Sequence, residues 1–260
     1  MMTRYLPATP LLFIAMAASA NNTMSVGDGQ IDGAKLKPYR LVWQQCSLQD
    51  GAWQNQGKLT EELVLIGDDT LRHRQLSTQP DGVIGQSTVY FRRASFAPLR
   101  MEVDATKEGE TLFHAERVLN SGGYTGVVVR GDNTRTLQGT ISSNMLHGGA
   151  MGLPLATMRE QDTPIEFPAS MIGFDGSYDV VAQWSGKETL EFEGRKIEAS
   201  LVDVEWHHRE SGDVYPPGPD ASGGRYWIVP NPPAGFPYVP RYKTDSYAVE
   251  FISDACPETD

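Results

Sequence analysis

The sequence predicts a mainly β protein, built as a single large antiparallel meander with one short helix in the middle of the chain. Two observations favour this fold. The segment 99–104 alternates strictly between apolar and charged residues, which places Leu99, Met101 and Val103 on one face of a strand. Short apolar runs also recur along the chain between turn-forming residues. A sheet with one apolar and one charged face is typically antiparallel, with one side in water.

The first twenty residues have the features of a secretory signal peptide. Arg4 precedes the apolar run 11–18, and the small-residue tripeptide 18–20 closes it, which predicts cleavage after Ala20. The run is far shorter than the roughly 20 residues that a membrane-spanning helix needs, and no later stretch approaches that length. We therefore expect a mature chain without a transmembrane segment, located in the periplasm or secreted.

Residues 21–37 form a polar, glycine-rich segment without an apolar period, which predicts a flexible leader ahead of the fold. The rest of the chain, 38–260, is expected to be one β-rich domain, because all-β folds of about 200 residues or more commonly stay undivided. Hydrophobic residues make up 40% of the sequence and charged residues 21%, so the composition supports a folded core.

From Tyr39 onwards the pattern is that of strands. Runs rich in β-branched, aliphatic and aromatic residues occupy 62–66, 88–91, 112–115, 126–129 and 201–206. Turn-forming pairs separate such runs at Asp50-Gly51, Asp81-Gly82, Glu108-Gly109 and Glu193-Gly194. The helix is expected at 153–161, where Pro154 could occupy the first helical position and the sequence 162–164 would end it.

Residues 215–242 differ in composition from the rest of the chain. Eight of the 17 prolines fall here, between tyrosine, tryptophan and phenylalanine residues. Proline cannot donate to a strand ladder, so most of this segment is expected to be loop, with a short strand at 225–229. Rigidly held aromatic rings suit a hydrophobic or amphipathic ligand, and the ligand-binding candidates are Tyr226, Trp227, Phe236 and Tyr238. The alternative is that these rings pack inward and close one end of the sheet.

Net charge limits the classes of partner. The chain has 33 acidic and 22 basic residues, which gives a net charge of −11 at pH 7. Loss of Arg4 with the signal peptide leaves 21 basic residues and a net charge of −12. Such a surface repels polyanions, so we expect neither a nucleic-acid partner nor binding to anionic lipid headgroups.

The two cysteines lie near opposite ends of the expected domain, Cys46 in the first strand and Cys256 just after the last. An oxidising compartment favours a disulfide between them. A bridge that closes a loop of about 210 residues removes unfolded-chain entropy worth at most about 5 kcal/mol. It would also join the two ends of the chain, which favours a single domain.

Three further segments carry a family resemblance: 95–102, with its Pro98-Leu99-Arg100 triplet, then 194–199, and then 224–228 followed by Pro240-Arg241-Tyr242. In this spacing the chain resembles exported bacterial proteins of unknown function that are similar in plan to the outer-membrane lipoprotein carriers. The resemblance extends over 39–252. It implies a long curved antiparallel sheet, or half-barrel, wrapped part-way round a helix, and it brings no catalytic residues.

One group of residues could carry metal chemistry. Glu205 and His207 share a strand face and, with His208, could bind a metal ion for hydrolysis. A third ligand on that face would have to come from another histidine, His73, His114 or His147. The alternative is a solvated strand end. No Gly-x-Ser-x-Gly motif or phosphate-binding loop is present, so we assign no catalytic residues and no cofactor.

These observations favour an exported, non-enzymatic protein that binds a hydrophobic or amphipathic ligand, or a cell-envelope partner, in the concave face of its sheet. Two alternatives stay open. One is a metal-assisted hydrolase that uses Glu205, His207 and His208, and the other is a structural envelope protein without a ligand.

Overall fold

A computed structural model describes residues 22–24, 26–27, 29–120, 123–140, 145–147, 150–170, 178–208, 223–251 and 256–257. The expected signal peptide, 1–20, lies outside the described residues, as does the first part of the proline-rich segment. None of the described helices is long and apolar enough to cross a membrane.

The described strands form one sixteen-stranded sheet. The strands of the N-terminal half are β1 (Asn22–Thr23), β2 (Tyr39–Gln49), β3 (Ala52–Ile66), β4 (Thr70–Thr78), β5 (Val83–Arg92), β6 (Pro98–Lys107), β7 (Glu110–Asn120), β8 (Gly123–Arg130) and β9 (Asn133–Gly139). Those of the C-terminal half are β10 (Leu146–His147), β11 (Ile165–Ser170), β12 (Tyr178–Phe192), β13 (Arg195–His208), β14 (Gly224–Ile228), β15 (Arg241–Lys243) and β16 (Tyr247–Glu250).

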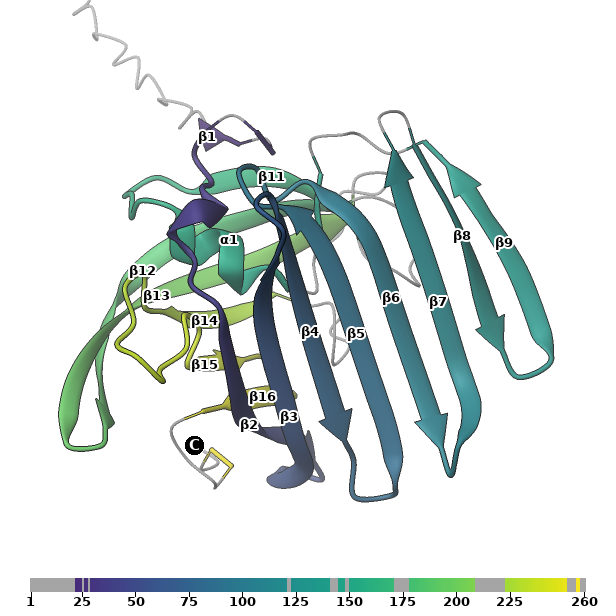
Figure 1. The fold of residues 1–260 in the computed structure, drawn as a ribbon. Coiled ribbons are helices and arrows are strands. Elements are labelled where there is room, and N and C mark those ends of the chain that lie inside the picture. The colour runs from purple at the N-terminus through teal and green to yellow at the C-terminus, as the bar shows by residue number, and fades with distance from the viewer. Residues whose placement is uncertain are drawn as a thin grey trace, which may run out of the picture.

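Two antiparallel meanders, β2–β9 and β11–β16, make up most of this sheet. They join where β16 pairs with β2, with Ala248 opposite Cys46. Only the short strands β1 and β10 pair in parallel, both with β11. The sheet is open and strongly curved, and the short helix α1 (Gly152–Thr157) lies within its curve (Figure 1). The mainly β, curved antiparallel fold is therefore confirmed.

The core lies against one face of the sheet, which we call the inner face. His73, Val89 and Met101 occupy adjacent positions on β4, β5 and β6, and all three are buried. Met101 has no exposed surface, as its alternating segment predicts, while Arg100 on the outer face is exposed and pairs with Glu116 at 3.0 Å. Side chains of α1, β11, β12 and β13 complete the core from the opposite side.

The N-terminal segment differs from the expected flexible leader. Met24, Ile31 and Leu36 are 0%, 2% and 3% exposed and belong to the main core. Between the last two lies a single 3-10 turn, η1 (Gly33–Lys35), in which the Asp32 carboxylate accepts a hydrogen bond from the Ala34 amide. Three isolated apolar side chains anchor this polar segment, and so few produce no periodic signal in the sequence.

The helix forms where it is expected but is shorter. It ends at Thr157 rather than 161, because Met158 is already extended. The Thr157 hydroxyl donates to the Pro154 carbonyl oxygen at 2.9 Å. All six helical residues are buried, which explains why no amphipathic period marks the helix in the sequence.

The expected disulfide is present. Cys46 and Cys256 are bonded, with their Cα atoms 5.7 Å apart. Cys46 lies on β2, opposite the last strand, so the bridge ties the C-terminal segment to the seam where the two halves of the sheet meet.

Candidate functional site

The four aromatic candidates from the proline-rich segment do not come together as one group. Tyr226 and Tyr238 contact the main core on the inner side of the sheet. Trp227 and Phe236 belong to a second cluster, formed with Leu190, Ile197, Ala199 and Val229. The split arises because Tyr226 and Trp227 are consecutive strand residues and so point to opposite faces. Two of these rings therefore pack in each cluster.

Trp227 is held by a polar network. Its indole N–H donates to Glu188 at 2.8 Å, and the Arg241 guanidinium lies 5.0 Å from the ring centre. Arg241 in turn binds Glu188 at 3.1 Å and forms a second ion pair with Glu250. The indole group thus has its partners within the protein.

The three residues of the metal hypothesis also separate. Glu205 and His207 are in contact, with Oε2 and Nε2 3.2 Å apart. His208 lies on the other side of β13, where its ring contacts the edge of buried Tyr178. Across the described ranges, no three His, Cys, Asp or Glu side chains lie close enough together to hold a metal ion.

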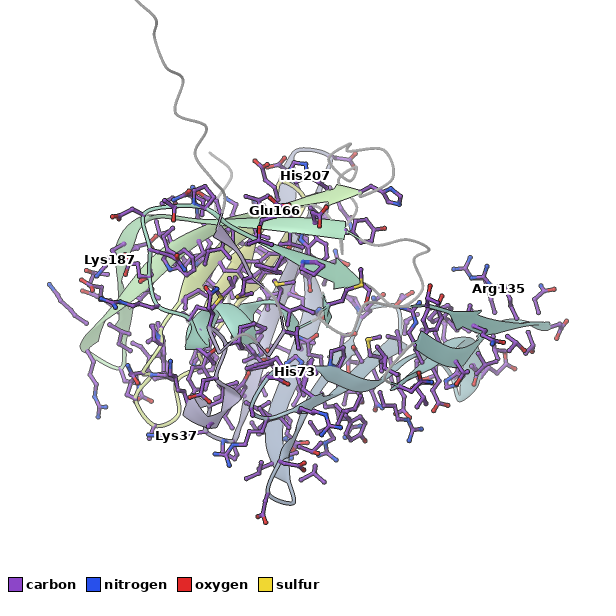
Figure 2. The ribbon with its side chains drawn as sticks, turned by 90° about the horizontal axis from the view of Figure 1, so that it is seen from above. Lys37, His73, Arg135, Glu166, Lys187 and His207 are labelled. Atoms are coloured by element: carbon purple, nitrogen blue, oxygen red, sulfur yellow. A yellow bond between two sulfur atoms is a disulfide. The ribbon has the colours of Figure 1, made fainter. Side chains whose placement is uncertain are left out.

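A polar cluster that sequence reasoning did not find lies on the inner face of β2, β3 and β4. The Tyr39 hydroxyl donates to Glu61, and His73 Nε2 lies 3.0 Å from the same carboxylate oxygen. Glu61 is 8% exposed and His73 3% exposed. Figure 2 shows His73 deep among the packed side chains. We call Tyr39, Glu61 and His73 the Glu61 cluster.

Burial would raise the pKa of Glu61, but the hydrogen bond and charge of His73, with further hydrogen bonds from Tyr39 and Gln75, outweigh it and lower the pKa. Burial, together with the neighbouring Glu61 charge, raises the pKa of the Tyr39 hydroxyl well above its ordinary value. The cluster therefore keeps an ionised carboxylate in the core beside a neutral phenol. The register row of Glu61 continues through Gln75 and Ser87 into a more open part of the same face.

That open part lies on the inner face of β4–β8, beyond the row of His73, Val89 and Met101. Two adjacent rows of the register cross it, and they also contain Gln75, Phe113 and buried Ala115. Six half-buried residues of these rows have small or β-branched side chains: Ser77, Gly85, Ser87, Val103, Ala105 and Val128. We call these residues the inner strip. The core leaves the strip partly exposed, although it faces the same side as the buried residues.

The outer face of these strands is different, because charged pairs cover it. Arg72 binds Glu62 at 2.7 Å, Arg100 binds Glu116, and His114 contacts Asp104 at 2.7 Å. Such exposed pairs contribute little stability but keep this face in water. Exposed Ile84 and Val118 also lie on the outer face, so the two faces differ in their charged pairs rather than in exposed apolar side chains.

Comparison with known proteins gives one structural match. The chain is similar to the hypothetical lipoprotein YmcC from Escherichia coli, with 9% sequence identity and a TM-score of 0.29, over 88% of this chain and 92% of that one. No protein-family model and no curated protein matches the sequence.

Proposed function

We propose that this chain is an exported, non-enzymatic binding protein of the cell envelope, which holds a hydrophobic or amphipathic ligand on the inner strip. The observation that carries the proposal is the strip itself: a floor of small or β-branched side chains, two of them serines, half-buried on the concave side of a curved sheet. Small residues keep the floor low, so an elongated apolar molecule can lie across the strands.

Export is supported by two features. The signal-peptide pattern at 4–20 predicts cleavage after Ala20, and the Cys46–Cys256 disulfide suits an oxidising compartment. Mass analysis of protein isolated from its own cell envelope should find a mature N-terminus at Asn21. Retention of Met1 would contradict export.

Burial of apolar surface provides enough free energy for such binding. A ligand that loses about 300 Å² of apolar area gains roughly 7 kcal/mol at about 25 cal/mol per Å². The costs of association and of ordering the ligand reduce this gain to about micromolar affinity. The proposal therefore expects reversible uptake.

A bulky side chain introduced into the inner strip tests the proposal. Ala105→Trp places an indole on the floor and should weaken binding of an environment-sensitive fluorescent fatty-acid probe at least ten-fold. Thr125→Trp, on the exposed outer face of β8, is the matched control and should bind like the wild type. Circular dichroism and thermal melting verify that both variants fold. A wild-type protein that takes up no probe, or equal binding by both variants, would show the proposal to be wrong.

A further inference from the structure

Each of the two rows that form the inner strip contains an arginine on β8 or β9, and the second row continues past its arginine to Asn133. One row runs through Ser87, Val103, Ala115 and Val128 to Arg135 on β9. The next runs through Ser77, Gly85, Ala105 and Phe113 to Arg130 on β8. Both arginines are exposed, and they are diagonal neighbours on adjacent strands; such residues typically lie roughly 7–8 Å apart. Figure 2 shows Arg135 at the projecting end of the sheet.

Charges are segregated between the faces of this part of the sheet. On β6–β9 the inner face carries Lys107, Arg117, Arg130 and Arg135, whereas the carboxylates of Glu102, Asp104 and Glu116 lie on the outer face. Among the described strand residues of β4–β9, the one inner-face carboxylate is Glu110, opposite Lys107 at the hairpin end. Of these cations Arg117 is buried and Lys107 pairs with Asp81 at 3.7 Å, whereas Arg130 and Arg135 are exposed at the end of the strip.

Aromatic rings position two of these arginines. The Arg117 guanidinium lies 4.2 Å from the centre of the Tyr124 ring, and the Arg130 guanidinium lies 5.7 Å from that of Phe113. A guanidinium that stacks on an aromatic ring uses its face for that contact, and its N–H groups lie in its own plane. Such in-plane N–H groups bind carboxylates and phosphates in a bidentate manner. Phe113 lies between Ala105 of the strip and Arg130, so it connects the apolar strip to the cationic end.

We propose that the ligand is an anionic lipid, with its headgroup on Arg130 and Arg135 and its acyl chain across the inner strip. The inference rests on the proposed function and names the ligand class. Four strand spacings of about 4.8 Å separate β4 from β8, roughly 19 Å in all, which accommodates a chain that spans one leaflet of about 15 Å. The net charge predicted repulsion of anionic headgroups, but the local charge of this face is of the opposite sign.

The test compares headgroups on one chain. Dodecyl phosphate should displace the fluorescent fatty-acid probe from the wild-type protein at a concentration at least ten-fold lower than dodecanol. The double variant Arg130→Gln/Arg135→Gln should lose this preference and keep its affinity for dodecanol. Arg72→Gln/Arg100→Gln, on the outer face of β4 and β6, is the charge-matched control and should behave as the wild type. Added salt should weaken displacement by dodecyl phosphate and leave that by dodecanol unchanged.

The outcomes separate the two proposals. If neither amphiphile binds, the proposed function is wrong. If both displace the probe equally well from the wild type, the binding function stands and the anionic headgroup site is wrong. Inorganic phosphate that displaces the probe as well as dodecyl phosphate would indicate a free-anion site and would overturn the lipid assignment. Circular dichroism and thermal melting verify that the double variant folds.

Discussion

Glu61 is the residue that distinguishes the inner face from an ordinary hydrophobic core, because its carboxylate is buried. It lies among apolar side chains, and Tyr39 and His73 both hydrogen-bond to it. A buried charge of this kind is tolerated because its partners replace water. The neighbouring Glu62 has the same chemistry on the outer face, where it pairs with half-exposed Arg72. Strand alternation alone gives these consecutive residues different environments.

Glu61→Gln should therefore cost about 2–3 kcal/mol of unfolding free energy at pH 7, since it removes a buried charge-assisted hydrogen-bond network. The folded-state pKa of Glu61 is lowered, so its stabilising contribution is complete above the unfolded value of about 4.3 and is lost as the pH falls below it. Urea unfolding at pH 7 and at lower pH should show the difference between wild type and variant shrinking in acid. Glu62→Gln should cost less than about 1 kcal/mol at pH 7. Equal costs for the two variants would contradict the burial of Glu61.

At the scale of elements, the short segments inside the curve hold the halves of the sheet together. The N-terminal segment contacts α1: the Lys35 ammonium donates to the Thr157 carbonyl oxygen at 2.8 Å. Gly33 permits the close approach to the sheet, because a Cβ there would lie 2.2 Å from the Arg93 carbonyl oxygen. The Tyr238 hydroxyl accepts a hydrogen bond from the Lys37 amide at 2.8 Å, which links the proline-rich segment to the same region.

Ile31→Ala tests whether this segment is part of the core. Loss of a side chain that is 2% exposed should cost about 2–5 kcal/mol, whereas a flexible leader would show almost no effect. Lys37→Ala, at an exposed position six residues later, should change the unfolding free energy by less than about 0.5 kcal/mol. Chemical denaturation of both variants gives the comparison.

At the scale of the whole molecule, the two ends of the chain meet at one seam within the open sheet. The last strand, β16, pairs with the first long strand, β2, and the Cys46–Cys256 bridge lies beside that pairing. Contacts across the seam join residues that are about two hundred positions apart, so the folded sheet depends on bringing the chain ends together. The disulfide reduces the entropy that the unfolded chain gains when the seam opens.

Cys46→Ser/Cys256→Ser should lower the unfolding free energy by about 2–5 kcal/mol. A reducing agent should destabilise the wild type by a similar amount and leave the double variant unaffected. Thermal melting with and without reductant measures both effects. Two titratable thiols in the denatured, non-reduced wild type would show that the bridge does not form.

The sequence predicted what local chemistry decides. Alternation at Met101 places that side chain in the core, turn residues divide the chain into a meander, and the cysteines pair as expected. The helix position also followed from local signals, although its end did not, because burial of every helical residue removes the periodic pattern. Sequence patterns report secondary structure and face, since both depend on residues a few positions apart.

The candidate site depended on the tertiary structure. Tyr226 and Trp227 are neighbours in the sequence but face different clusters, because consecutive strand residues point to opposite sides of the sheet. Arg130 and Arg135 join one cationic end of the inner strip only because the β8–β9 register places them on the same face. The net charge predicted repulsion of anions, but it is a sum over the whole sequence and does not say on which face each charge lies. The sequence by itself determined the strands and the disulfide; the curvature and register decided which side chains share a surface, because that depends on pairings between distant strands.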